Sequence, residues 1–205
     1  MLAATFTEIF ARGGLVMWPL LGLSVIAVTL MLERAWFFYT TNRRGRLGRV
    51  SAMGKALRTG RHQDAKQQAV ADRSVYGDAV RRMLDEQVTE AGALDAIEQQ
   101  RARLERFLPI LSTIITAAPM LGILGTVLGI IRSFDVLAGG RADLDLNVLA
   151  GGIAEALITT AAGITVALLT LFPYNAFRAQ VDRSISRLES LAAAALQDDT
   201  SKPTG

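Results

Sequence analysis

Three long stretches of the chain are apolar and almost free of charge, and this pattern constrains the fold more than any other feature. Residues 13–32 and 107–131 contain no charged side chain, and residues 146–177 contain one, Glu155. The hydrocarbon core of a bilayer is about 30 Å thick, so a helix needs about 20 apolar residues to cross it. The sequence therefore predicts an all-α integral membrane protein with three transmembrane helices.

The composition argues against an enzyme or a metal protein. The chain has no cysteine and one histidine, His62, which lies in a polar stretch. No Ser–His pair can form inside the predicted spans, and no cluster of metal-ligand residues occurs. We therefore expect no enzymatic activity, no cofactor and no metal site.

The basic residues near the predicted spans indicate the orientation of the chain. One side of the membrane receives only Arg12, Arg132 and Arg141, whereas the other receives eleven arginines. The side richer in arginine is normally cytoplasmic. This places the N-terminus outside and the C-terminus in the cytoplasm. The net charge of +3 thus reports topology, and we expect no nucleic-acid partner.

The spans divide the chain into eight predicted segments. They are a periplasmic interfacial helix at 1–12, the first span at 13–39, a cytoplasmic helical region at 40–106, the second span at 107–132, a short periplasmic loop at 133–146, the third span at 147–177, a cytoplasmic helix at 178–197 and a disordered tail at 198–205. Apolar residues recur at helical spacing in 79–106 and in 178–197. We expect the second and third spans to extend into a cytoplasmic helical bundle, the second as one helix from 79 to 131.

A basic cluster follows the first span at the predicted cytoplasmic interface. It consists of Arg43, Arg44, Arg46 and Arg49, directly after the aromatic run 36–39. Two interpretations remain open. The arginines could contact anionic lipid headgroups, or they could serve only to set the topology.

The second span has one face of small residues. At 100° per residue, one third of the helix circumference beside Thr126 carries Ala118, Gly122, Gly125, Gly129 and Ser133. Small residues four apart allow two helix backbones to approach closely. Pro119 frees a backbone carbonyl and can bend the helix.

The third span repeats this arrangement. One side carries Gly152, Ala156, Thr159, Thr160 and Gly163, with Glu155 at its edge. These small faces could serve only to pack helices. Hydroxyls at mid-depth on both spans also fit a polar pathway through the membrane.

Glu155 is the only carboxylate in the three apolar stretches 13–32, 107–131 and 146–177. A charged side chain at the bilayer centre costs at least ~2.5 kcal/mol and commonly marks an ion or proton pathway. A solvated glutamate near the interface is the simpler alternative. Because one carboxylate makes a sparse proton relay, either Glu155 carries the proton with hydroxyls and water, or a partner supplies the titrating group.

Two sequence motifs resemble those of a known family. Residues 118–129, APMLGILGTVLG, and residues 152–161, GIAEALITTA, are similar to the second-span and third-span signatures of the MotA/TolQ/ExbB proton-channel family. Residues 13–34 resemble the first span of ExbB-like members. The resemblance covers nearly the whole chain. Three spans favour ExbB or TolQ, because MotA-type stators have four.

This resemblance implies a subunit of a motor driven by the proton-motive force in the bacterial inner membrane. ExbB and TolQ form homopentamers around a single-span partner, ExbD or TolR, that carries an intramembrane Asp, and they energise TonB or TolA. By motif position, Thr126 and Thr160 match the pore-lining threonines and Glu155 the third-span glutamate. Thr159 falls where a small residue is common, so the resemblance assigns it no role. The alternative is a passive membrane scaffold whose small faces only pack helices.

Overall fold

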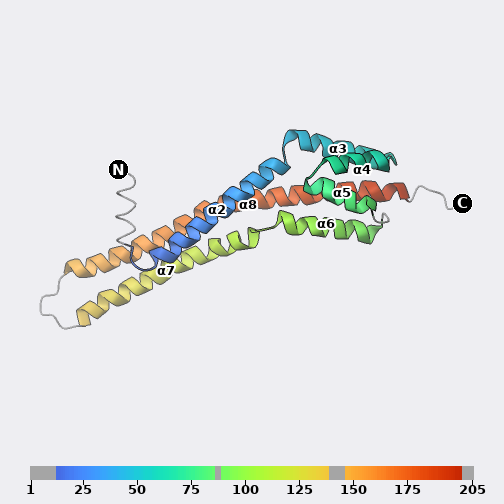
Figure 1. The fold of residues 1–205 in the computed structure, drawn as a ribbon. Coiled ribbons are helices and arrows are strands. Elements are labelled where there is room, and N and C mark those ends of the chain that lie inside the picture. Colours follow the sequence, from blue (N-terminus) through green and yellow to red (C-terminus); the bar gives the residue numbers. More distant parts are fainter. Residues whose placement is uncertain (1–12, 86–88, 139–145, 200–205) are drawn as a thin grey trace. The chain divides into compact units, whose positions relative to one another are not determined.

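The computed structural model describes residues 13–85, 89–138 and 146–199 of the chain. Within these ranges every regular element is a helix, and no strand occurs (Figure 1). The helices are α2 (Met17–Thr41), α3 (Arg44–Arg58), α4 (His62–Ala71), α5 (Val75–Asp85), α6 (Glu90–Leu104), α7 (Leu108–Ala138) and α8 (Leu146–Asp199). The predicted all-α fold is confirmed.

Three of these helices are long and apolar enough to cross a membrane. The segments are Met17–Thr41 in α2, Leu108–Asp135 in α7 and Ala150–Gln197 in α8. They overlap most of the three stretches identified from the sequence, so the prediction of three transmembrane helices is confirmed.

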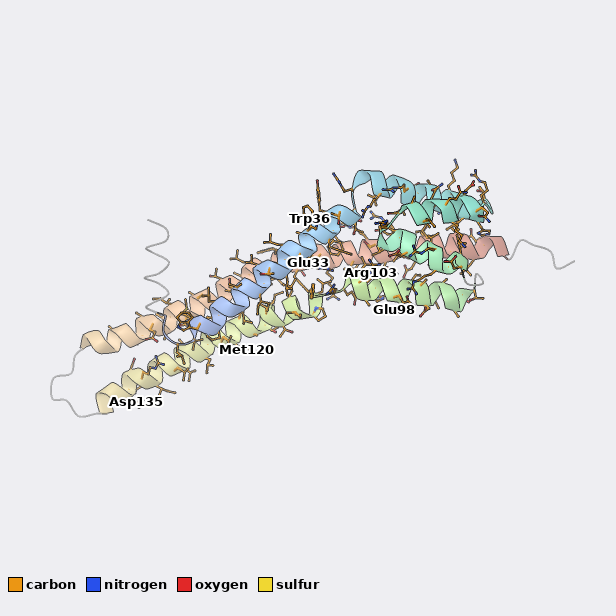
Figure 2. All side chains as sticks on the ribbon, viewed as in Figure 1. Glu33, Trp36, Glu98, Arg103, Met120 and Asp135 are labelled. Carbon is orange, nitrogen blue, oxygen red and sulfur yellow. The ribbon has the colours of Figure 1, made fainter. Side chains whose placement is uncertain are left out.

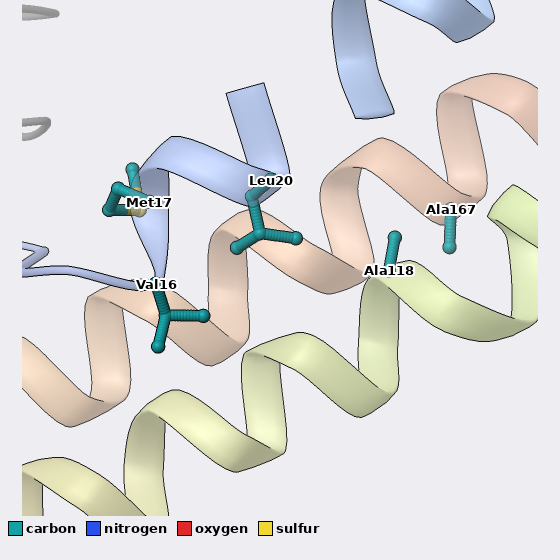
Figure 3. Packing of buried hydrophobic residues seen from close by; sticks show 5 residues of the cluster. All are labelled: Val16, Met17, Leu20, Ala118 and Ala167. Atoms are coloured by element: carbon teal, nitrogen blue, oxygen red, sulfur yellow. The ribbon is translucent and has the colours of Figure 1, made fainter. Parts of the chain in front are cut away.

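The chain divides into two compact units, and the first contains the membrane segments. It comprises residues 1–32 and 109–175. Its buried apolar cluster consists of Val16, Met17, Leu20, Ala118 and Ala167 (Figure 3). Alanines supply the contribution of α7 and α8 to this cluster, which leaves little side-chain volume between the two helices. Large apolar side chains instead point outward, among them Met120 (Figure 2).

The second unit comprises residues 33–108 and 176–205. In it α3 packs against α4, α4 against α5, and α5 against α6. Tyr76 of α5 is fully buried, and its hydroxyl hydrogen-bonds to the hydroxyl of Ser184 in the last part of α8 at 3.1 Å. Arg187 of α8 donates to the same Tyr76 oxygen at 3.3 Å. A polar contact thus joins α5 to α8 in the buried part of this unit.

The prediction of one helix from residue 79 to residue 131 is wrong. The chain forms α5, α6 and α7 as separate helices, and Phe107 lies between the last two with φ 70°. A proline inside a helix clashes with the carbonyl four residues before it, whereas a proline in the first turn does not. Ending α6 at Leu104 and starting α7 at Leu108 places Pro109 in that first turn. The start of α6 is capped by Thr89, whose Oγ1 accepts from the Gly92 amide.

Other segment boundaries differ from the sequence-based ones by a few residues. The third span and the helix predicted to follow it form a single helix, α8, with Pro173 inside it. The predicted loop 133–146 is shorter, because α7 continues to Ala138. The predicted tail begins at 198, but α8 includes Asp198 and Asp199. The predicted interfacial helix at 1–12 and residues 200–205 lie outside the described residues.

Candidate functional site

The hydroxyls of Thr126 and Thr160 form a direct contact between α7 and α8. Their Oγ1 atoms lie 2.8 Å apart, and either can be the donor. Each hydroxyl also reaches a backbone carbonyl at 2.9 Å, Thr160 that of Gly122 and Thr126 that of Ile123. When Thr126 donates to Thr160, Thr160 donates to Gly122. When Thr160 donates to Thr126, Thr126 donates to Ile123. Both arrangements use every hydroxyl hydrogen, so the pair can exchange one for the other.

Glycines on both helices make this contact possible. A Cβ atom at Gly122 would lie 3.0 Å from the Cα of Thr160, and one at Gly129 would lie 2.9 Å from the Cβ of Ala156. A Cβ at Gly163 would overlap the carbonyl of Ala118. The small-residue faces inferred from the sequence therefore face each other, and the helix backbones approach closely along them.

The close packing of α7 against α8 continues along the helices beyond the threonine pair. A Cβ at Gly152 would overlap the hydroxyl of Ser133, which donates to the Gly129 carbonyl at 2.9 Å.

Pro119 lies within α7 and is partly buried. Because proline has no N–H, the carbonyl of Ile115 loses its usual partner one turn earlier.

Thr159 occupies a position to which the sequence assigned no role. Its side chain is 1% exposed, and its Oγ1 lies 3.0 Å from the Gly13 carbonyl and 2.8 Å from the Glu155 carbonyl. Its Cγ2 methyl packs against Gly125, where a Cβ would overlap it. Thr159 thus fixes the turn before α2 to α8. Its position on the small face of the third span was the available sequence signal.

Glu155 forms an ion pair with Arg132 that the sequence analysis did not identify. Arg132 Nη1 of α7 lies 3.1 Å from Glu155 Oε1 of α8. The glutamate side chain is 29% exposed and the arginine side chain 54%. In the sequence, Arg132 served only to mark the end of the second span. Which charged groups meet depends on the register between the two helices, and one helix's periodicity does not fix that register.

An apolar groove runs beside the threonine pair between α7 and α8. Its volume is about 370 Å³, and its walls include Thr126 and Phe134 of α7 and Ile153, Ala156 and Leu157 of α8. Phe134 and Leu157 are more than 60% exposed. Across the described ranges, no group of three or more His, Cys, Asp or Glu side chains could hold a metal ion.

The basic cluster after the first span is partly engaged within the second unit. Arg46 lies 4.0 Å from the Asp72 carboxylate, and Arg49 donates to the Ala71 carbonyl at 3.3 Å. Arg43 lies over the ring of Tyr39, with its guanidinium carbon 5.6 Å from the ring centroid. The side chain of Arg44 lies outside the described part of the chain. Contact between this cluster and lipid stays a prediction.

Comparison with known proteins gives a family match over most of the chain. The sequence model of the MotA/TolQ/ExbB proton channel family matches residues 53–190. Two ExbB-like biopolymer transport proteins of Synechocystis sp. are similar. ExbB-like 1 is 34% identical over 90% of this chain and 74% of the relative. ExbB-like 3 is 35% identical over 86% of this chain and 87% of the relative. The Tol-Pal system protein TolQ of Pseudomonas aeruginosa is 40% identical over 47% of this chain and 42% of the relative.

Proposed function

The chain belongs to the MotA/TolQ/ExbB proton channel family, and we propose that it is the channel-forming subunit of a motor driven by the proton-motive force. The contact between the hydroxyls of Thr126 and Thr160 carries this proposal, because it places two exchangeable hydrogens between adjacent membrane helices. Glu155 stands one to two helical turns from Thr160 on α8, where it is paired with Arg132.

A partner protein supplies the carboxylate that titrates. In the membrane part of the first unit, the described acidic side chains on α7 and α8 are Asp135 and Glu155, and Glu155 is paired with Arg132. Proton transport across a membrane normally uses ionisable groups. We therefore propose an ExbD- or TolR-like single-span partner with an intramembrane Asp, inside a homo-oligomer that the family resemblance implies to be a pentamer.

The apolar groove beside Thr126 supports such an assembly. Its exposed Phe134 and Leu157 suit a neighbouring helix, and the adjacent hydroxyl of Thr126 suits a polar group carried by that helix. We propose that protonation of the partner's carboxylate near Thr126 and Thr160 changes its contacts and turns one part of the assembly against the other.

We place the protein in the bacterial inner membrane, with its N-terminus in the periplasm and its C-terminus in the cytoplasm. The eleven arginines on one side support this orientation. The work it energises is TonB- or Tol-dependent transport or envelope maintenance. The two ExbB-like proteins of Synechocystis match 86–90% of the chain, which supports an ExbB-type system.

The competing function is a passive scaffold, and the close glycine packing of α7 on α8 is compatible with it. The variant Thr160→Val separates the two, since valine keeps the shape of threonine and loses the hydroxyl. Thr165→Val is the matched control, because the Thr165 hydroxyl is exposed and bonds only to the Ala161 carbonyl of its own helix.

The measurement is proton flux through the complex, purified from its own membranes and reconstituted in liposomes. A channel subunit predicts that Thr160→Val loses flux with assembly intact, while Thr165→Val keeps it. Full flux in Thr160→Val would remove the role of the hydroxyl pair and favour the scaffold.

A further inference from the structure

The carboxylate of Glu155 contacts the turn that precedes α2 as well as Arg132. Gly14 in this turn has φ +66°, a conformation that glycine adopts readily and other residues rarely do. A Cβ atom at Gly14 would overlap Glu155 Oε1. The carboxylate oxygen that Arg132 binds therefore rests directly on the Gly14 backbone, where no side chain would fit.

The same turn is held again one helical turn further along α8. Thr159 follows Glu155 by four residues, so both lie on one face of the helix. The buried Thr159 hydroxyl reaches the carbonyl of Gly13 at 3.0 Å. Two side chains of α8 that are one helical turn apart, Glu155 and Thr159, thus contact the neighbouring glycines Gly14 and Gly13.

Arg132 supplies the third element of this arrangement. Its guanidinium reaches across from α7 and compensates the negative charge of Glu155 at 3.1 Å. A carboxylate near the bilayer is costly without such a partner. A carboxylate that carries protons must repeatedly lose its charge, and each loss would break the contact with Arg132.

We propose that Arg132 is a positioning residue and that Glu155 is an ion-paired clamp rather than a proton carrier. The clamp, made of Arg132, Glu155, Thr159, Gly13 and Gly14, holds α7, α8 and the start of α2 together at one end of the first unit. The statement that Glu155 carries no proton rests on the proposed function. The existence of the clamp is independent of that function.

A double-mutant cycle on the full chain tests the clamp. The variants are Arg132→Gln, Glu155→Gln and the double variant, with Asp135→Asn as the control for removing an exposed charge near the same end of α7. The first readout is the Tm of the chain purified in detergent, which requires no proton transport. We expect each single variant to lower the Tm by about 3 °C, and the double variant to lower it no further than one single variant does. Asp135→Asn should leave the Tm unchanged.

The second readout is proton flux through the reconstituted complex. The double variant has no carboxylate at residue 155, but its two amides can hydrogen-bond across the same gap. We expect it to keep at least about half of the wild-type flux, and each single variant to have less than the double variant.

Two outcomes would overturn the proposal. One is additive Tm losses in the double variant, which would show that the two side chains are not coupled. The other is complete loss of flux in Glu155→Gln and in the double variant but not in Arg132→Gln, which would make Glu155 a proton carrier. Absence of flux in the wild-type complex would refute the proposed function instead, and the Tm cycle would still decide whether the clamp exists.

Discussion

The side-chain oxygens of Thr126 and Thr160 lie 2.8 Å apart on two different helices. The contact depends on Gly122, where any Cβ would press on the Thr160 backbone at 3.0 Å. A hydroxyl pair at this separation is rigidly placed, because each oxygen is also within 2.9 Å of a carbonyl of α7. Its chemistry can therefore be tested by substitutions that leave the backbone unchanged.

Replacement of Thr126 by serine or valine separates the effect of its hydroxyl from that of its shape. Thr126→Ser keeps the oxygen and should keep proton flux within about twofold. Thr126→Val removes it, so the Thr160 hydroxyl keeps only its bond to the Gly122 carbonyl, and loss of the hydroxyl pair should lower the flux about tenfold or more. Flux through the reconstituted complex is the measurement.

Thr113→Val is the control on the same helix, since the exposed Thr113 hydroxyl donates only to the Pro109 carbonyl. Equal flux in Thr126→Ser and Thr126→Val would contradict the prediction, because shape alone would then suffice.

Substitution of Gly125 should destabilise the first unit through Thr159. A Cβ at Gly125 would overlap the Thr159 side chain, which is buried and cannot move aside without losing its bonds to two carbonyls. We expect Gly125→Ala to cost ~1–3 kcal/mol, the usual range for overpacking, and to lower the Tm in detergent. Gly151→Ala on α8 should cost nothing, because no atom lies within 4 Å of the added methyl.

The double variant Gly125→Ala/Thr159→Ser tests the cause of that loss. Serine keeps the hydroxyl of Thr159 and removes the methyl, which is the nearest overlapping atom; the Cβ of residue 159 would still lie 2.7 Å from the added methyl. The Tm should therefore recover part of its loss. A Tm as low as that of Gly125→Ala alone would show that the Thr159 methyl is not the cause of the destabilisation.

Arg34 should be among the most sensitive positions of the second unit. Its guanidinium is 2% exposed, and it donates to the carbonyls of Arg103 at 3.2 Å and Leu104 at 3.5 Å, at the end of α6. It also pairs with Glu33 and lies 5.4 Å from the centre of the Phe107 ring. One side chain thus holds the carbonyls of the last turn of α6 and the residue with positive φ that follows.

Both Arg34→Ala and Arg34→Lys should therefore be destabilising. Alanine removes the donor to the two carbonyls and leaves a cavity where the buried side chain lay, so we expect a loss of about 2–4 kcal/mol in unfolding free energy. Lysine keeps the charge without the planar fork and should lose about half as much. Arg106→Ala is the control, because the exposed Arg106 also lies over the Phe107 ring, at 4.6 Å. A full loss in Arg106→Ala with none in Arg34→Ala would reverse the assignment.

Hydropathy was sufficient to locate the membrane helices. The three apolar stretches coincide, to within a few residues, with parts of α2, α7 and α8, because a span must satisfy its backbone within the helix and its length follows from the bilayer. The break before α7 was not predictable in the same way. Pro109 is compatible with a kink inside a helix or with the first turn of a new helix. The structure has a new helix, and Arg34 contacts the end of the preceding helix, α6.

The helical periodicity correctly grouped the small residues of α7 and of α8, but pairs across the two helices required the structure. A rotation of 100° per residue gives the face of the helix on which Thr126 or Thr160 lies. It does not give the positions of the two residues along the helix axes relative to each other. The ion pair of Arg132 with Glu155 and the contact of Thr159 with Gly13 were missed for this reason. Arg34 was counted only as a topology marker, since a charged residue at the end of a span is usually solvated. The roles of these residues in proton passage stay predictions.

The two hydrogen arrangements at Thr126 and Thr160 have a consequence for direction. In one arrangement the hydrogens point toward Gly122, and in the other toward Ile123, with equally short bonds of 2.9 Å at either end. Bond length favours neither arrangement, so the pair by itself sets no direction. In an assembly built on this pair, the direction of proton movement would be set by the electrochemical gradient. It would also depend on the order in which a partner group binds and leaves.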